Sequence, residues 1–567
     1  MFLAVVGLYG LLAYAVRQRT CEIGVRMALG AARGDVIRMV LRQGLALTAS
    51  GLAIGLIGAG LAALWGAALL YGIHAFDPVT FVILPVLMML AASIACLLPA
   101  WKAARAWILS PACATNNQAS DTIVPIALRR MKLGPILALC IGSSLALAQT
   151  APAENGFVLK GGTVHTISGG VIENGSVLVR NGKIVGVGKN LTAPKDFKVI
   201  EITGQHVYPG MIDPASMIGL EKASEELASD AQEIGLINPQ LRAATAVNPD
   251  SESIEMTRAN GITSAIVMPQ GDLIAGQMSL IHLDGSSNND MLVSRTASIF
   301  LRFPAITTVP LRPHEDLNDD EEPHTDDTPE PIPHEQAVKT YQERLQTLRT
   351  FFDEARLYKR AKQSKSRDFK PNLKFEALLP VLDGTTPMFV EAVREREIRE
   401  AIAFADEQKI KIILADAYEA YKVLPLIKSH NIPVVLGPTF TYPLDRDEAY
   451  DRNYTIPADL YKAGIKFAIG TFSAMSSRNL PFQAAAAVPY GLPEDAAYKA
   501  VSLNAAEIFG LGKKLGSIDE GKSADLIVTD GDPLDVRTTV KMVFIDGKPA
   551  DLETKQKMLY EKYKTQK

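Results

Sequence analysis

Cysteine is absent from residues 149–567, because all four cysteines of the 567-residue chain (Cys21, Cys96, Cys113 and Cys140) come earlier. This absence excludes disulfide bonds and thiolate metal sites from the longer, carboxyl-terminal part of the chain. The sequence also lacks an excess of positive charge. Its formal net charge is −4, which argues against a protein built on contacts with nucleic acid.

The charges that are present divide the chain into two unlike parts. Residues 1–148 carry 11 basic and 4 acidic side chains, whereas the remainder carries 47 basic and 58 acidic ones. The first part also holds two uncharged runs, Gln43–Phe76 and Pro78–Trp101. Each run exceeds the roughly 20 residues that a helix needs to cross a bilayer. We therefore predict transmembrane helices in the first part, with its arginine-rich segments on the cytoplasmic side.

A specific motif in this first part points to a known family. Arg19–Ala31 reads R-x-x-E-I-G-x-R-x-A-L-G-A, and it is followed by a glycine-rich span, then DPVTF and LLPAWKAARA. Residues 1–107 resemble the carboxyl-terminal end of an FtsX-like ABC transporter permease. The resemblance implies contact with a membrane through residues 1–107, which we expect to be the bacterial inner membrane.

A junction separates this segment from the rest. Residues 108–130 are predicted to form a linker. Residues 131–148 follow a pair of arginines, are mostly apolar and end in Ala146-Leu147-Ala148, which is the form of a secretory signal peptide. A further transmembrane helix is the alternative for this segment. In either case residues 149–567 are expected outside the cytoplasm, periplasmic or secreted. Our hypothesis is that two neighbouring reading frames have been joined.

The second part shows two kinds of strand pattern. Residues 149–207 and 512–567 contain short β-rich runs broken by glycine and asparagine, which is typical of antiparallel sheets. Between them, residues 208–511 alternate short apolar strands with amphipathic helices, such as those predicted for 392–408 and 417–430. That alternation predicts an α/β fold with a (β/α)8 TIM-like barrel. An acidic insertion near 312–336 precedes a charged helix predicted for 336–370.

The order of these segments is that of the amidohydrolase superfamily. The stretches GGTVHTISGGVIENGSVLVRNGKIVGVG, VYPGMID, SLNAAEIFGLGKKLGSIDEGKSADLIVTDGDPL and VKMVFIDGK carry the resemblance, which covers about residues 155–560. The similarity is to the imidazolonepropionase-like branch. It implies a β-sandwich formed by both ends of this part beside the barrel, and hydrolysis of C–N bonds other than peptide bonds, of the cyclic amide type. A divalent metal would be expected for this family.

The residues that would bind that metal are missing. The family places an H-x-H pair after the first barrel strand and an aspartate, which binds metal and shuttles a proton, in a G-T-D-S setting. Here those positions hold Ala215, Met217 and Phe472. None of these side chains can ligate a metal as imidazole or carboxylate does, so we expect no metal cofactor and regard metal-dependent catalysis as unsupported.

Other side chains at the expected barrel mouth are candidates for a replacement site. Asp213, Glu391 and Asp416 could converge there as ligands of a hard cation. Ser473 lies beside them but has no assigned base. The alternative is that Asp213 braces a turn and that the other two carboxylates are solvated.

Two function classes therefore stay open for residues 149–567. The first is a hydrolase with a rebuilt or absent metal site. The second is a non-catalytic barrel that binds a small-molecule ligand or a partner protein, fused to a permease remnant. The sequence does not establish an oligomeric state.

Overall fold

The computed structural model describes residues 156–220, 235–308, 331–364 and 369–564. The contacts of the chain divide it into two compact units, Met1–Ala148 and Gln149–Lys567, and every described residue belongs to the second. Within these ranges no helix has the length and apolar character of a membrane span. The transmembrane helices and the signal-like segment predicted for the first unit lie outside the described residues.

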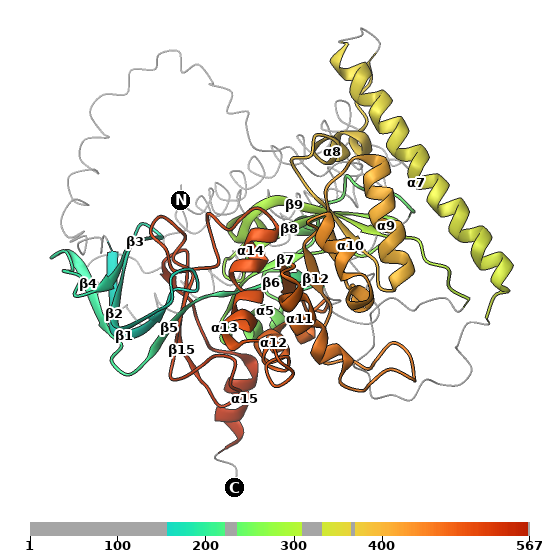
Figure 1. Cartoon of the computed structure of the whole chain (residues 1–567). Coiled ribbons are helices and arrows are strands. Elements are labelled where there is room, and N and C mark those ends of the chain that lie inside the picture. Colours follow the sequence, from blue (N-terminus) through green and yellow to red (C-terminus); the bar gives the residue numbers. More distant parts are fainter. Residues whose placement is uncertain (1–155, 221–234, 309–330, 365–368, 565–567) are drawn as a thin grey trace, which may run out of the picture. The chain divides into compact units, whose positions relative to one another are not determined.

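One sheet unites the two ends of the second unit (Figure 1). Its order is β16-β15-β14-β5-β1-β2-β3, and β4 pairs with β1. The two ends meet where β5 and β14 pair antiparallel, with Val207 opposite Val528. The strands are β1 (Gly156–His165), β2 (Val171–Arg180), β3 (Lys183–Lys189), β4 (Phe197–Glu201), β5 (His206–Pro209), β14 (Leu526–Thr529), β15 (Val540–Ile545) and β16 (Lys548–Pro549).

The turn between β2 and β3 shows how the sequence specifies this sheet. Asn181 and Gly182 both have positive φ, of 51° and 76°. A two-residue hairpin turn of this kind needs positive φ at both positions, and asparagine followed by glycine supplies it at the smallest steric cost.

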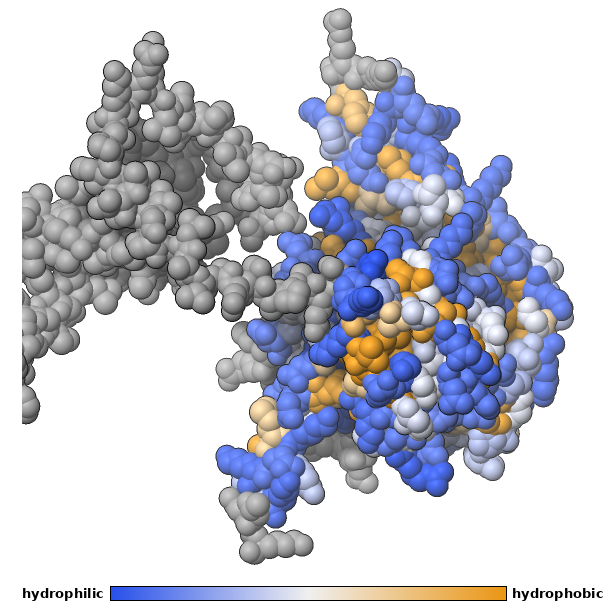
Figure 2. Space-filling model, turned by 90° about the vertical axis from the view of Figure 1, so that its left-hand side faces the viewer, coloured by the Kyte–Doolittle hydropathy of each residue, from blue (hydrophilic) through white to orange (hydrophobic). Residues whose placement is uncertain are grey.

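On the face shown in Figure 2, hydrophilic residues predominate and hydrophobic ones gather in patches between them.

A second sheet forms the barrel-like centre, in the order β13-β12-β11-β10-β9-β8-β7-β6. The backbone N–H of Phe472, just after β13, donates to the carbonyl of Ala215 on β6 at 2.8 Å, which links the two ends of the sheet. The strands are β6 (Met211–Ser216), β7 (Ile262–Val267), β8 (Ile274–His282), β9 (Leu292–Arg302), β10 (Met388–Glu391), β11 (Ile412–Ala415), β12 (Val434–Leu436) and β13 (Phe467–Ile469).

The direction of one strand corrects the sequence-based prediction of eight parallel strands. β8 runs antiparallel to both β7 and β9, whereas β6–β7 and all pairs from β9 to β13 are parallel. A parallel pair needs a crossover of a dozen or more residues, usually a helix. Residues 268–273 between β7 and β8 are too few for one, so the chain turns back directly.

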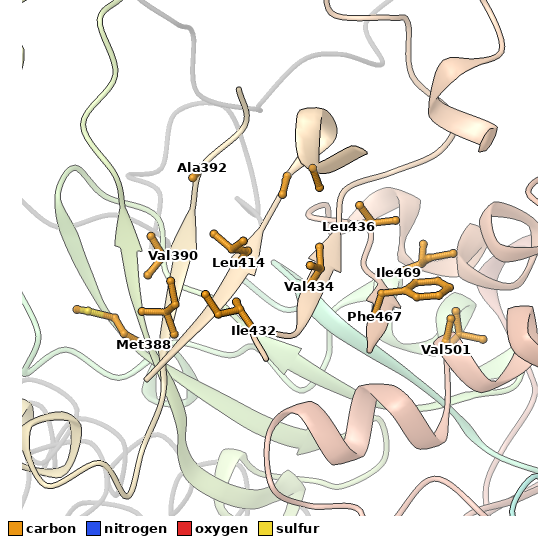
Figure 3. Packing of buried hydrophobic residues seen from close by; sticks show 14 of the residues in the cluster. Met388, Val390, Ala392, Leu414, Ile432, Val434, Leu436, Phe467, Ile469 and Val501 are labelled. Carbon is orange, nitrogen blue, oxygen red and sulfur yellow. The ribbon is translucent and has the colours of Figure 1, made fainter. Parts of the chain in front are cut away.

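Side chains alternate between the two faces of the barrel strands. Phe389, Ile413, Val435 and Ala468 belong to the inner cluster. Their neighbours along β10 to β13, among them Val390 and Leu414, face outward and pack in the layer beneath the helices (Figure 3). This period of two, with both faces apolar, is what a sheet buried on both sides requires.

The surrounding helices differ from the predicted ones in places. The helix predicted for 417–430 is wrong as a single element, because it divides into η4 (Tyr418–Lys422) and α10 (Leu424–Ser429). Pro425 stands in the first turn of α10, where its missing N–H costs no hydrogen bond, so a new helix begins there.

The charged helix predicted for 336–370 is found as α7 (His334–Gln363), and α9 (Glu395–Gln408) follows β10. The remaining helical elements are η2 (Ala243–Thr245), α5 (Glu252–Ala259), α6 (Asn288–Met291), α8 (Leu373–Leu382), α11 (Arg452–Ala463), η5 (Met475–Asn479), α12 (Leu480–Ala485), α13 (Glu494–Ala500), α14 (Leu503–Ile508) and α15 (Lys555–Tyr563).

Candidate functional site

Asp213 lies on β6 and is completely buried. Its carboxylate accepts four hydrogen bonds: from Thr471 Oγ1 at 2.5 Å, from Ser477 Oγ at 3.0 Å, and from the backbone N–H groups of Thr471 and Ala215 at 3.2 and 3.3 Å. Burial raises the pKa of Asp213 to about 7, against the lowering effect of these four donors. The side chain therefore bonds to the protein itself and has no face directed at a ligand.

Hydroxyl groups extend this network between β6 and the segment after β13. Ser216 Oγ donates to the Ser473 carbonyl at 3.1 Å. Ser477 Oγ, whose single proton is donated to Asp213, lies 2.7 Å from Ser216 Oγ and 2.7 Å from the same carbonyl. Each member of the network thus has a partner within it. The network fastens the first barrel strand to the last, which is a structural role.

Ala215 and Phe472 lie in hydrophobic core. Phe472 is 4% exposed, and its ring centroid lies 6.2 Å from that of Phe389. Phe389 in turn lies 6.1 Å from Phe300 and 5.9 Å from Phe509, so four aromatic rings fill the centre of the barrel. Ala215 stands at the position where the family resemblance places an imidazole, and Phe472 stands at that of the catalytic carboxylate.

The backbone of Phe472 adopts a conformation that a bulky residue rarely takes. Its φ is +52°, in the left-handed region, where asparagine and aspartate are several-fold enriched. Such strain persists only when the surroundings over-determine it. Here the hydrogen bond from Phe472 N–H to the Ala215 carbonyl and the packing of the ring hold it in place.

A divalent metal does not fit this donor set. The three positions offer a methyl group, a thioether and a phenyl ring, whereas zinc takes imidazole, thiolate or carboxylate ligands. Met217 is only partly buried against the same cluster, and Gln270 contacts its sulfur. The position of the expected metal site is therefore filled core.

The other candidates do not form a compact ligand set. Among the described residues, one set of three or more metal-ligating side chains has its atoms within 4.8 Å of one another, and it consists of Glu419, Asp445 and Glu448. Asp213, Glu391 and Asp416 do not form such a set. Glu391 ends β10 and Asp416 directly follows the neighbouring strand β11, whereas Asp213 lies on β6. Their convergence on one cation stays a prediction.

Asp416 and Ser473 are both engaged in local backbone structure. Asp416 has φ +55° and is 1% exposed, and it lies so close to β12 that a side chain on Gly437 would collide with it. Ser473 Oγ accepts from the N–H of Ser476 at 3.1 Å, which caps the turn that begins η5. Neither geometry is that of an activated nucleophile with its base.

Each member of this acidic set already has a partner in the chain. Asp445 accepts two hydrogen bonds from Arg394, at 2.9 and 3.0 Å. Glu419 is buried and paired with Lys422 at 2.9 Å, and Glu448 accepts from Tyr421. Two of the three carboxylates are thus paired with cations of the chain itself.

Glu391 differs from these carboxylates. It ends β10 and its Oε1 accepts from Arg302 Nε, at the end of β9, at 2.9 Å. Its side chain is only 10% exposed, and Oε2 has no hydrogen-bond partner in the described structure. Both residues line a cavity of about 390 Å³.

The described histidines lie away from the barrel centre. His165 Nε2 and His206 Nδ1 are 3.1 Å apart in the first sheet, and His165 stacks on Tyr208. Burial and the neighbouring His206 lower the pKa of His165 to about 4. His282 bonds Ser264, and His430 bonds Asp406. His314, His324 and most of the acidic insertion lie outside the described residues.

Two residues of this region, Ser477 and Arg302, are not identified by reasoning from the sequence. Their partners are 264 and 89 residues away, so no local pattern marks either contact. The available signal for Arg302 is a charged residue directly after the apolar run Ile299-Phe300-Leu301.

Comparison with known proteins supports both resemblances. Residues 383–550 match the model of the Amidohydrolase family, and residues 1–107 match that of the FtsX-like permease C-terminal family. A curated relative, Amidohydrolase tasK of Hapsidospora irregularis, is 24% identical over 391 residues. That match covers 64% of this chain and only 38% of the relative.

Solved structures of amidohydrolases resemble the second unit. An amidohydrolase from Thermotoga maritima MSB8 matches with 27% identity and a TM-score of 0.60, over 70% of this chain and 99% of that one. An adenosine deaminase from Xanthomonas campestris with bound zinc matches with 15% identity and a TM-score of 0.40, over 72% and 99% of the two chains. The second likeness is too distant to bear on chemistry.

Proposed function

We propose that residues 149–567 form a non-catalytic binding barrel, an amidohydrolase fold that captures a small molecule and does not hydrolyse it with a metal. The observation that carries this proposal is Phe472. Its ring occupies the position of the proton-shuttling aspartate and packs against Phe389 in the inner core. Catalysis by a metal-bound water would need side chains that ligate the metal and a polar opening in the core at the position of Phe472.

The alternative is hydrolysis of a C–N bond, as the names of the relatives suggest. That chemistry needs an activated nucleophile and a group to accept its proton. Asp213 is the candidate proton acceptor on β6, but its oxygens accept hydrogen bonds from Thr471, Ser477 and two backbone N–H groups. A substrate would have to displace the network that fastens β6 to the segment after β13.

We further propose that the barrel works outside the cytoplasm and is held at the membrane by the amino-terminal segment. The match of residues 1–107 to a permease family supports membrane association. The signal-like sequence of residues 131–148, with basic residues before its apolar run, supports export of residues 149–567.

Metal content is the test. Residues 149–567 form one compact unit, and the Thermotoga maritima neighbour matches over 99% of its own chain, so we choose this part for production without a polyhistidine tag. We expect less than one-tenth equivalent of zinc, iron or manganese by mass spectrometry, and no hydrolysis of cyclic amides or dipeptides. The zinc-bound Xanthomonas campestris protein, prepared in the same medium, is the positive control. Near-stoichiometric metal together with turnover would overturn the proposal.

A further inference from the structure

A cavity of about 320 Å³ lies where helices beside the barrel meet the carboxyl-terminal end of the chain (Figure 1). The end of α5, the segment from η5 into α12, the start of β15 and the first turn of α15 form its wall. Its volume is at the lower end of the range of small-molecule sites in proteins. The wall residues used most below are Met256, Arg478, Phe482, Thr538, Thr539 and Lys557.

The described residues that form this wall include two cations and no carboxylate. Arg478 is partly buried, and its Nη1 donates to the sulfur of Met256 at 3.3 Å, which is a weak acceptor. Lys557 is exposed, and its ammonium group donates to the carbonyl of Leu552 at 2.6 Å. Within the described part of the chain neither cation belongs to an ion pair, so both charges remain available to an anion.

The cavity of about 390 Å³ beside Glu391 has a different charge balance. Its wall holds three carboxylates and two arginines, and both arginines are paired with acids of the same wall. The charges of that wall therefore already compensate one another. Of these two cavities, only the one at Arg478 has cations left for a ligand.

Uncharged donors lie in the same wall as the two cations. Thr538 and Thr539 line the cavity from the loop before β15. α15 also begins at this wall, with Thr554 as its N-cap and no acidic residue in its first turn. Glu255, which accepts from the N–H of Lys555, lies outside the wall. Because the N-terminus of a helix carries partial positive charge, it adds to the potential of the two cations.

The rest of the wall is largely apolar. Met256 and Pro533 are buried, and Phe482 is partly buried. All three line the cavity. The wall therefore offers positive charge and hydroxyl groups for an anionic group, and a separate surface for hydrocarbon.

We propose that this cavity binds a small organic oxyanion, with its carboxylate or phosphate group on Arg478 and Lys557 and its apolar body against Met256 and Phe482. The inference rests on the proposed function, because it names the place of capture and the ligand class of the binding barrel. A neutral ligand would leave both cations without a partner, and inorganic phosphate would leave the apolar wall uncovered. An oxyanion that carries a hydrocarbon group meets both.

The experiment is titration calorimetry on the full chain in detergent, with phenylacetate and phenyl phosphate as probes. We expect at least one of the two to bind, and the tighter one identifies the anionic group. Phenylacetamide has the shape of phenylacetate without its charge, and inorganic phosphate has the charge without the ring. Each should bind at least about tenfold more weakly than the tighter probe, because each lacks one half of the recognition.

Matched variants locate the site. Lys557→Gln and Arg478→Gln should each weaken binding of the tighter probe about tenfold or more, because each removes a charge-assisted pair. Lys557 is exposed, so its replacement should leave the fold unchanged. Lys562→Gln is the control, because Lys562 is a cation of the same helix, α15, but does not line the cavity. Its affinity for the probe should be that of the parent.

Three results would overturn the inference: no binding of either organic anion at millimolar concentration, equal binding of phenylacetamide, or a Lys557→Gln protein with the affinity of the parent. The last holds even where Arg478→Gln fails to fold. Metal content of the same samples separates this failure from that of the proposed function. Absent binding with little metal removes only the oxyanion site, whereas stoichiometric metal with turnover removes the binding-barrel proposal itself.

Discussion

The centre and the rim of the barrel treat their polar groups in opposite ways. At the centre, Asp213 is fully buried and accepts four hydrogen bonds from the chain, and aromatic rings fill the space around Phe472. At the rim, Glu391 is also nine-tenths buried, but only its Oε1 is hydrogen-bonded, to Arg302, and its Oε2 has no partner in the described structure. Asp213 lies on β6 and Glu391 ends β10, two strands of the same sheet.

The difference separates a carboxylate whose hydrogen bonds are all made by the protein from one that keeps an unmade hydrogen bond. A carboxylate whose lone pairs are all used by the protein contributes to holding the strands together. A buried carboxylate with an unused lone pair and space beside it is a cost to the folded state unless a ligand or water offsets it. The buried fraction of a carboxylate therefore does not distinguish these two kinds of carboxylate. The number of hydrogen bonds that each one leaves unmade does.

The largest effect should come from restoring the family's aspartate at the centre. Phe472→Asp removes an aromatic ring from the core and buries a charge without a partner, which together should destabilise the fold by about 5 kcal/mol. The left-handed backbone at this position suits aspartate and would return only about 1 kcal/mol. Urea denaturation measures the difference.

Phe440→Asp is the matched control, because Phe440 is 50% exposed in the loop after β12. Its free energy of unfolding should change by no more than about 0.5 kcal/mol. A Phe472→Asp protein as stable as this control would mean that the centre is open and solvated, and the contrast between the two regions would disappear.

The second effect is the pH dependence contributed by Asp213. Its pKa is about 7 in the folded protein against 3.8 for the ordinary group, so the unfolded chain ionises first as pH rises. Stability from this group is then present at low pH and is lost between about pH 4 and pH 7, by about 4 kcal/mol in all.

Asp213→Asn keeps the shape of the side chain and cannot ionise. Its stability advantage over the parent should grow by about 3 kcal/mol between pH 5 and pH 7 and stay constant above that. Melting curves at a series of pH values provide the measurement. Parallel curves for the two proteins would show that the four donors keep Asp213 ionised in the fold.

A smaller effect is expected at Ser477, whose single hydroxyl proton is donated to Asp213. Ser477→Ala should cost about 1 to 2 kcal/mol, because it leaves a buried acceptor without that donor. Ser429→Ala is the comparison, since Ser429 is exposed and its partners are the Leu426 carbonyl and the adjacent His430 ring. Equal stability of the two variants would remove the structural role assigned to the network.

The sequence predicted the framework of this fold better than its interior. Short, continuously apolar runs, such as the one that contains Ile413, indicate buried strands directly. The replacement of the family's metal ligands by Ala215 and Phe472 can also be read from the sequence. The reversal of β8 was missed, because a short turn and a crossover differ in length and not in apolar pattern. The pairing of Arg302 with Glu391 depends on the neighbouring positions of β9 and β10, which no local pattern encodes.

The smallest expected effect is at the rim, where Glu391→Gln should change the free energy of unfolding by less than about 1 kcal/mol. The amide oxygen can still accept from Arg302 Nε, and the partly exposed guanidinium keeps its contact with water. Chemical denaturation without ligand gives this value, and the Glu407→Gln protein gives the baseline for losing a carboxylate beside an arginine of α7. A loss of several kcal/mol at Glu391 alone would mean that its carboxylate is a structural brace like Asp213. A small change would place the two carboxylates in different roles, since only Asp213 would then contribute to holding the fold together.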